Sequence, residues 1–336
     1  MRAAHLPGDH PIIPAPKIGV LLVNLGSPEA PTRVAVKAYL KEFLSDRRVV
    51  ELPPFLWQII LRAFVLNTRP RNTAHAYAQV WTKDGAPLAA ITAEQAYGLS
   101  FGETVIVDWA MRYGKPAVAD RVKALKEAGC QRILIAPLYP QYSGATTATV
   151  NDRVFDVLKG MRWQPAIRTL PPWHDDPAYI DALKLSVERQ IAALTFVPET
   201  IVASFHSMPV STLEDGDPYH CQCQKTARLL SNALGRELVV SFQSKLGRAK
   251  WLEPSTEETL ARLGREGVKS VAVVTPGFSA DNLETLEEIA IRGRETFVEA
   301  GGTDLAALEC LNASVEGMDL LHCIVGRELE GWLPRS

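Results

Sequence analysis

One histidine stands where a predicted strand ends, in a position where its side chain could do chemistry. His206 closes the apolar run 199–205, and Pro209 follows it and prevents the strand from continuing. Imidazole is the natural base near neutral pH and a common ligand of first-row metals. A single His is also a frequent structural residue, so its position at the strand end is what favours a functional role.

A row of carboxylates is the second candidate group. Asp281, Glu284 and Glu288 are three and four residues apart, which places them on one face of a helix expected over 281–292. The row begins just after another predicted strand, and carboxylates are favoured at the N-terminal end of a helix. Such a row could pass cations or protons. The structural alternative is a solvent-exposed face on which Arg292 pairs with Glu288.

Cationic and aromatic side chains follow two further predicted strands. Arg112 and Tyr113 come after one of them, and the segment 139–149, which is rich in hydroxyl and aromatic side chains, comes after the next. This combination suits a flat, partly apolar, anionic ligand. Either set alone could also be core packing.

The candidates share a predicted scaffold of short apolar runs that alternate with helical periodicity. Because the runs are continuously apolar, we expect parallel strands that are covered on both faces. The pattern runs twice along the chain, which predicts two doubly wound α/β halves whose ligands bind at the carboxyl ends of the strands. The predicted strands are 18–23, 104–108, 132–138, 199–205, 238–242 and 270–275.

Composition and missing motifs exclude several classes of protein. The chain has 336 residues, of which 47% are hydrophobic, so it is not an intrinsically disordered protein. Its formal net charge of −2 lacks the positive excess that is typical of nucleic-acid-binding proteins. Its five Cys are an odd set without framework spacing, which indicates reduced thiols. No dinucleotide-binding glycine motif, P-loop, nucleophile elbow or H-E-x-x-H motif occurs.

The segment 53–66 is apolar on nearly all sides but too short to span a membrane. It is either a buried core helix or an exposed lip that rests on a membrane surface or guards an apolar ligand. The Pro-rich residues 1–17 lack the apolar run of a signal peptide, so we expect a disordered tail.

Taken together, these segments resemble the ferrochelatases, which insert Fe(II) into a porphyrin to make haem. The resemblance runs from about residue 18 to 325, and the segment 278–288 completes it. It rests on five motifs in the same order: Val23–Pro28, Ala136–Ser143, Phe205–Pro209, Gly216–Tyr219, and Phe242–Gly247 with Trp251.

The resemblance implies two similar Rossmann-like halves, each with a parallel four-stranded sheet flanked by helices, and a cleft between them. It also implies that the apolar segment is a lip. The expected division of the chain is a tail 1–17, an N-terminal half 18–172 with the lip 53–70, and a C-terminal half 173–336 with the acidic helix 281–292.

The resemblance also implies roles for single residues. His206 and Glu284 would contact the metal from opposite faces of the macrocycle, with His206 as either the proton acceptor or the first metal ligand. Glu288, with Asp281, would continue an acidic path, and Glu288 would lie on a partly π-type helix. Leu25 favours protoporphyrin IX over coproporphyrin. The residues expected near the porphyrin are Leu25, Arg69, Tyr77, Arg112, Tyr113 and Ser143.

The implied substrates are protoporphyrin IX and Fe(II), with no cofactor required for catalysis. A [2Fe-2S] cluster that uses Cys221 and Cys223 is the less favoured alternative. Asn282 stands where many members of the family carry His or Cys. We expect a cytoplasmic monomer, with peripheral membrane contact through the lip. The alternative functions are a Co(II) or Ni(II) chelatase for another tetrapyrrole, and a two-lobed binding protein without catalysis.

Overall fold

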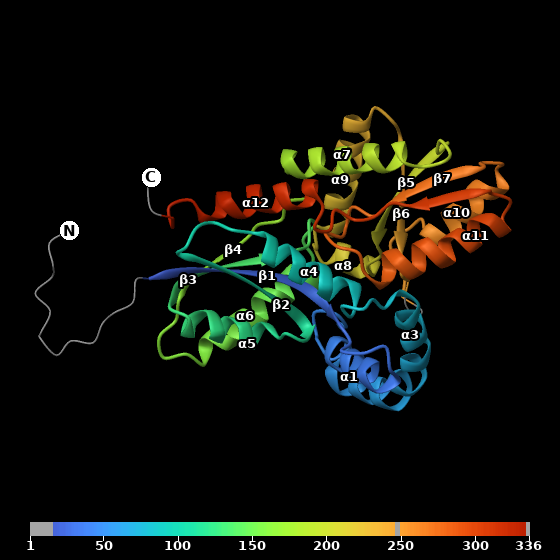
Figure 1. Ribbon diagram of the computed structural model, residues 1–336. Helices are drawn as coiled ribbons and strands as arrows, with labels where there is room; N and C mark the ends of the chain where they lie inside the picture. Colours follow the sequence, from blue (N-terminus) through green and yellow to red (C-terminus); the bar gives the residue numbers. More distant parts are fainter. Residues whose placement is uncertain (1–15, 246–248, 334–336) are drawn as a thin grey trace, which may run out of the picture.

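The computed structural model describes residues 16–245 and 249–333. Two α/β halves form the chain, and each is built on four parallel strands, as predicted (Figure 1). The tail expected over 1–17 lies outside the described residues except for Pro16 and Lys17, and Lys17 already belongs to β1.

The N-terminal sheet has the strand order β2-β1-β3-β4, and the C-terminal sheet has the order β6-β5-β7-β8. The strands are β1 Lys17–Ser27, β2 Val105–Gly114, β3 Cys130–Pro137, β4 Ala166–Thr169, β5 Thr200–His206, β6 Leu238–Gln243, β7 Ser270–Val274 and β8 Asp304–Ala307. The helices of the N-terminal half are α1 Arg33–Leu44, α2 Pro54–Ile60, α3 Leu66–Val80, α4 Pro87–Gly98, α5 Val118–Glu127 and α6 Thr149–Lys159, with the π-helices η1 Leu61–Val65 and η2 Gly144–Ala148. Those of the C-terminal half are α7 Pro177–Ala192, α8 Val210–Glu214, α9 Tyr219–Leu234, α10 Thr256–Arg265, α11 Arg294–Glu299 and α12 Val315–Leu329, with the π-helix η3 Glu284–Gly293.

The central strands are buried on both faces, which explains their continuously apolar sequences. In β1, Val20 and Leu22 pack into one core, whereas Leu21 and Val23 pack against α5 and α6 on the other side of the sheet. Side chains alternate along a strand, so a strand covered twice needs apolar residues at every position. The edge strands β4 and β8 have four residues each and lack such a run, so the hydrophobic pattern did not locate them.

One hydrophobic core joins the two halves. Helix α12 (red in Figure 1) leaves the C-terminal half and packs on the N-terminal sheet, where Leu320 and Ile324 lie in the same core as Val20 and Leu134. At its end, the carbonyl oxygen of Trp332 accepts a hydrogen bond of 3.2 Å from an N–H of Arg132. The halves are therefore held together as one packed body.

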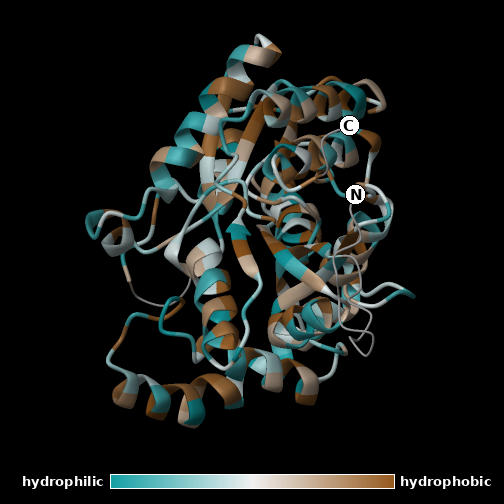
Figure 2. Ribbon diagram, turned by 90° about the vertical axis from the view of Figure 1, so that its left-hand side faces the viewer, coloured by the Kyte–Doolittle hydropathy of each residue, from teal (hydrophilic) through white to brown (hydrophobic). Residues whose placement is uncertain are grey.

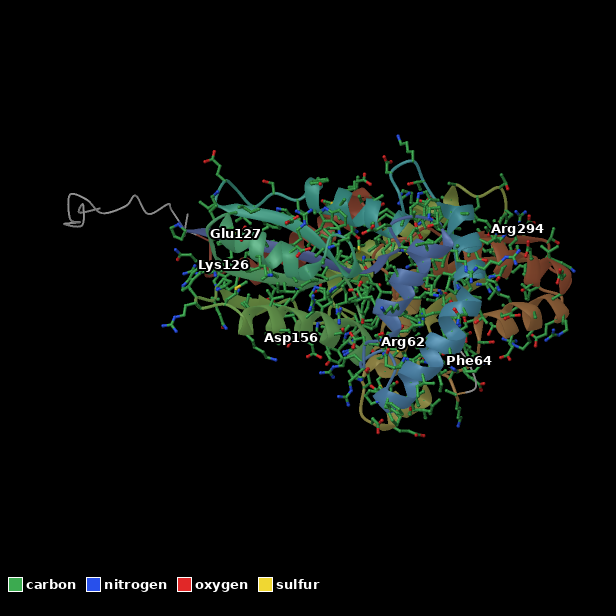
Figure 3. All side chains as sticks on the ribbon, turned by 90° about the horizontal axis from the view of Figure 1, so that it is seen from below. Arg62, Phe64, Lys126, Glu127, Asp156 and Arg294 are labelled. Carbon is green, nitrogen blue, oxygen red and sulfur yellow. The ribbon has the colours of Figure 1, made fainter. Side chains whose placement is uncertain are left out.

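The apolar segment forms α2 and η1 and is exposed, as the prediction of a lip requires, so the alternative of a buried core helix is excluded. Phe55 is 82% exposed and Phe64 is 65% exposed. Figure 2 shows hydrophobic ribbon along the helices at the lower edge of the molecule, and Figure 3 shows this side from below with Arg62 and Phe64 labelled. Buried Leu61 and the indole N–H of Trp57, which donates to the carbonyl of Leu44 at 2.6 Å, fix the lip to α1 and its surroundings.

Candidate functional site

His206 is the last residue of β5, and its ring is oriented by the backbone that follows. The Nδ1 atom lies 2.7 Å from the carbonyl oxygen of Ser207, which can only accept, so Nδ1 carries the proton. The neutral ring then presents Nε2 as a lone pair for a proton or a metal ion. The turn is held by the N–H of Ser207, which donates to the carbonyl of Gln243 at 2.7 Å.

The acidic residues lie at the start of a π-helix, η3, and the helix begins later than the sequence predicted. Asn282 caps it, because its side-chain oxygen accepts hydrogen bonds from the N–H groups of Glu284 and Thr285 at 3.0 and 3.1 Å. The range 281–292 is therefore wrong at its start, and Asp281 precedes the helix. The Asp281 carboxylate is buried and accepts hydrogen bonds from Thr285 at 2.8 Å and from the side chain of Asn312 at 2.6 Å.

Glu284 is the carboxylate whose environment is most altered. Burial raises the pKa of Glu284; a positive charge on His206, present only when its ring is protonated, opposes this rise, and the negative charge of Glu288 adds to it. Burial also raises the pKa of Tyr77, and the negative charge of Glu284 raises it further. The structure therefore brings Glu284 within electrostatic reach of His206 from its own half and of Tyr77 from the lip side. Helix α3, which carries Tyr77, contacts η3.

Glu288 is held by the end of β6 and not by Arg292 as its main partner. The backbone N–H of Ser244 donates to one Glu288 oxygen at 2.8 Å, and the Ser244 hydroxyl donates to the other. Arg292 makes its closest contact with Glu287, with 2.9 Å between Nε and Oε1, and lies 4.0 Å from Glu288. The Arg292–Glu288 pair, which was the structural alternative for this row, is thus present at 4.0 Å, but the π-helix also brings residues five apart onto one face and gives Arg292 a closer partner in Glu287.

Arg112 and Tyr113 converge on an aspartate that the sequence analysis did not select. Asp46 accepts hydrogen bonds from the Arg112 guanidinium, from the Tyr113 hydroxyl at 2.8 Å and from the Thr149 hydroxyl at 2.6 Å. Burial opposes ionisation, but the hydrogen bonds from Thr149, the Arg48 N–H and Tyr113, with the charge of Arg112, hold the pKa of Asp46 below its usual value. Tyr113 is fully buried, so its hydroxyl is engaged by protein groups.

Ser143 is also engaged inside the protein. It is fully buried, and its hydroxyl donates to Asp217 at 3.0 Å, which ties the loop after β3 to the segment before α9. Leu25 is partly buried beside the apolar core of the lip. Arg69, on α3, is half-buried, and burial lowers its pKa. No side chain in the described part of the chain forms an ion pair or hydrogen bond with Arg69, so its guanidinium is available to an anion.

The amino-acid sequence matches one protein family over nearly its whole length. The family model for ferrochelatase matches residues 17–329. The chain belongs to the ferrochelatase family. Ferrochelatases of Rhizobium meliloti and Rhizobium leguminosarum bv. trifolii are 54% and 50% identical to it, and each match covers 97% of this chain and 98% of the relative.

A solved structure supports the fold. The structure described as SirB from Bacillus subtilis with Fe3+ superposes with a TM-score of 0.55 at 14% identity, over 94% of this chain and 96% of that protein. The two-sheet architecture of this ferrochelatase family member is thus shared with a structure of very different sequence.

The Cys residues do not form an evident set of ligands. Cys221 is exposed, whereas Cys223, two residues later on α9, is buried, and burial raises its pKa well above the usual value. Within residues 16–245 and 249–333, no three His, Cys, Asp or Glu side chains are grouped so that they could hold a metal ion. A porphyrin supplies four nitrogen ligands of its own, so a ferrochelatase needs few protein ligands for the metal.

Sequence reasoning missed the groups that support the candidate residues. Asp46 follows α1 in an ordinary charged turn, and Ser244 follows β6 next to other polar residues, so neither has a periodic or motif signal. Ser244 has a φ of 67°, which is rare for a residue other than glycine. The position of Ser244 inside the segment Phe242–Gly247, which carries the family resemblance, was the only available signal.

Proposed function

We propose that this chain is a ferrochelatase that inserts Fe(II) into protoporphyrin IX and releases two protons. The observation that carries the proposal is that Glu284, partly buried at the start of η3, lies within electrostatic reach of His206, whose Nδ1 is bound to the Ser207 carbonyl so that Nε2 is left for a proton or a metal ion. Membership of the ferrochelatase family supports the same reaction.

His206 and Glu284 divide the work on the two inner protons of the ring. Protein contacts bend the bound ring so that its pyrrole nitrogens tilt out of the plane. The binding free energy of other parts of the substrate offsets the free energy that this distortion requires. His206 accepts a pyrrole proton at Nε2 while its Nδ1–H stays bound to the Ser207 carbonyl. Glu284, with Glu288 behind it, brings Fe(II) to the opposite face and carries protons away. The alternative, with His206 as the first metal ligand, uses the same atom.

Arg69 is the residue best suited to receive a propionate of the porphyrin. Its guanidinium is half-buried and has no anionic partner in the described structure. Burial disfavours the charged form of Arg69, and a bound carboxylate would stabilise that form through a charge-assisted hydrogen bond. Arg112 is already paired with Asp46, so we assign it to shaping the site rather than to holding a propionate directly. Leu25, beside the lip core, presents an apolar side chain to the ring and favours protoporphyrin IX.

The lip supports contact with a membrane surface. Phe55, Leu56, Ile59 and Phe64 are at least half exposed, and apolar side chains of this size are favoured at the boundary between lipid headgroups and acyl chains. No described helix is long and apolar enough to cross a bilayer. We propose a cytoplasmic monomer that touches the membrane through this lip, where an apolar porphyrin could be exchanged, and that works without a bound cofactor.

The decisive experiment is haem formation in an anaerobic assay with Fe(II) and protoporphyrin IX. The chain should form haem, and His206→Ala should lower turnover about 100-fold or more, because a positioned general base contributes roughly 10²–10⁴ in rate. His75→Ala, on an exposed face of α3, is the matched control and should keep full activity. Failure of the wild-type chain, or full activity of His206→Ala, contradicts the proposal. Preferred turnover of Co(II) or Ni(II) with another tetrapyrrole would favour the related chelatases instead.

A further inference from the structure

Buried hydroxyl and amide side chains lie on the face of the C-terminal sheet that carries His206. The Ser204 hydroxyl donates to the Gln243 side-chain oxygen at 2.6 Å and lies 2.7 Å from the Thr256 hydroxyl, which lies 2.9 Å from that of Ser241. Side chains alternate along a strand, so Ser204 and His206 on β5 point to the same face, as do Ser241 and Gln243 on β6. The rest of this face is apolar and packs on α10 and η3.

Gln243 is the member of this cluster whose hydrogen bonds are incomplete. It is 2% exposed, yet its side-chain nitrogen has no hydrogen-bond partner among the described residues. Ser204 donates to the amide oxygen, so the amide N–H groups are the end without a partner among the described residues. A buried amide of this kind is costly unless it binds an ordered water or is retained for function.

Gln243 lies between two residues of the proposed chemistry, His206 and Glu288. It is the neighbour of His206 in the register of β5 with β6, and its carbonyl accepts the Ser207 N–H at 2.7 Å. The next residue, Ser244, binds Glu288 with its N–H at 2.8 Å and with its hydroxyl. The backbone of Gln243 therefore lies between the turn that orients His206 and the clasp that holds Glu288.

We propose that Gln243 is a positioning residue for metal insertion, an inference that rests on the proposed function. Its side chain, fixed by Ser204 and completed by an ordered water, sets the end of β6 and so the places of His206 and Glu288 relative to each other. Gln243 is too buried to touch the porphyrin. Because misplacing reacting groups by about 1 Å can cost on the order of 100-fold in rate, its loss should lower turnover and leave porphyrin binding intact.

The test compares three variants of the full chain by kcat, by KM for protoporphyrin IX and by melting temperature. Gln243→Met keeps the length of the side chain and removes its polar atoms, and Ser204→Ala removes the donor that fixes it. Thr259→Val is the matched control, because the Thr259 hydroxyl is also buried without a hydrogen-bond partner among the described residues and lies on α10, three residues after Thr256. We expect kcat to fall about 10- to 100-fold in Gln243→Met and less in Ser204→Ala, with KM within twofold, and Thr259→Val to keep its kcat.

The inference is overturned if Gln243→Met and Ser204→Ala keep the wild-type kcat, or if Thr259→Val loses as much turnover as they do. A parallel rise in KM would also overturn it, because the residue would then act on substrate binding. If Gln243→Met does not fold, Ser204→Ala decides by the same criteria. A wild-type chain without haem formation would overturn the proposed function and this inference with it, whereas an active wild type with fully active variants overturns the inference alone.

Discussion

The Arg292 guanidinium binds the carboxylate of Glu287, five residues earlier, with 2.9 Å between Nε and Oε1. The π-helical geometry of η3 makes this pairing possible, and it draws Arg292 away from Glu288. Glu288 binds the N–H of Ser244 at 2.8 Å and lies 4.0 Å from Arg292, while Glu284 is partly buried and has no ion pair within the described residues. The helix thus carries three carboxylates in different surroundings: Glu287 is paired closely with Arg292, Glu288 is held mainly by Ser244, and Glu284 has neither partner.

Replacing the carboxylates of η3 should affect turnover in the order Glu284, Glu288, Glu287. We expect Glu284→Gln to lower kcat about 100-fold and Glu288→Gln about 10-fold, because the proposed function places Glu284 against the ring and Glu288 behind it. Glu287→Gln is the control and should keep its activity, since this carboxylate is paired with Arg292. Anaerobic steady-state kinetics measure the three effects, and a larger loss in Glu288→Gln than in Glu284→Gln would reverse the proposed direction of the path.

Glu284→Gln should also stabilise the protein at neutral and alkaline pH. Burial raises the pKa of Glu284 in the folded state, so its ionisation costs stability as the pH rises above the pKa of the unfolded chain, about 4.3. The neutral amide avoids that cost. The melting temperature of the variant should exceed that of the wild type at pH 8, and the gap should close near pH 4. Equal melting temperatures at both pH values would show that the carboxyl is not penalised by burial.

Asp46→Asn should destabilise the protein in a pH-dependent way. The variant leaves the Arg112 guanidinium, which is 13% exposed, without its counter-charge, so we expect a loss of about 2–4 kcal/mol in the free energy of unfolding at pH 7. The pKa of Asp46 is lowered in the fold, so its contribution is present above about pH 4 and is lost as the pH falls through the folded-state value. Denaturant titrations at pH 7 and pH 3 should show a difference between wild type and variant that shrinks on acidification.

Arg69→Ala should weaken porphyrin binding with little effect on kcat. A charge-assisted hydrogen bond to a propionate contributes about 1.5–3 kcal/mol, which corresponds to a rise of about 10- to 100-fold in KM for protoporphyrin IX. Arg71→Ala is the matched control, because Arg71 is exposed on the same helix. The porphyrin dimethyl ester, which lacks the carboxylates, should bind wild type and Arg69→Ala equally. A KM that stays unchanged in Arg69→Ala would remove the residue from the porphyrin site.

Exposed residues of the lip should control binding to membranes without affecting folding. The double variant Phe55→Ser, Phe64→Ser should reduce co-sedimentation with phospholipid vesicles about 10-fold or more, since each side chain loses apolar area that the lipid would bury. Its melting temperature should stay within about 2 °C of the wild type, because exposed positions contribute little to stability. Val197→Ser, at an 80% exposed position outside the lip, should bind vesicles like the wild type. Equal sedimentation of all three proteins would contradict a role of the lip at membranes.

The amino-acid sequence was sufficient for the parts of the structure that depend on local patterns. Continuous apolar runs such as 18–23 and 270–275 located the central strands, because a strand covered on both faces must be apolar at every position. His206 and Glu284 were selected because ligand-binding residues of parallel sheets follow the strands. The motifs around these residues indicated the family before any fold was described.

Tertiary structure decided the features that depend on residues far apart in the chain. Phe55 is exposed because the rest of the fold leaves its helix uncovered. Arg112 pairs with Asp46, and Ser244 binds Glu288, although no periodicity in the sequence connects these segments. The sequence pattern began the helix at Asp281, whereas the Asn282 side chain caps a helix that begins after it, and the pattern did not show that Glu287 is the closer partner of Arg292. A sequence pattern records which face a side chain prefers, whereas its partner depends on where the rest of the fold places that face.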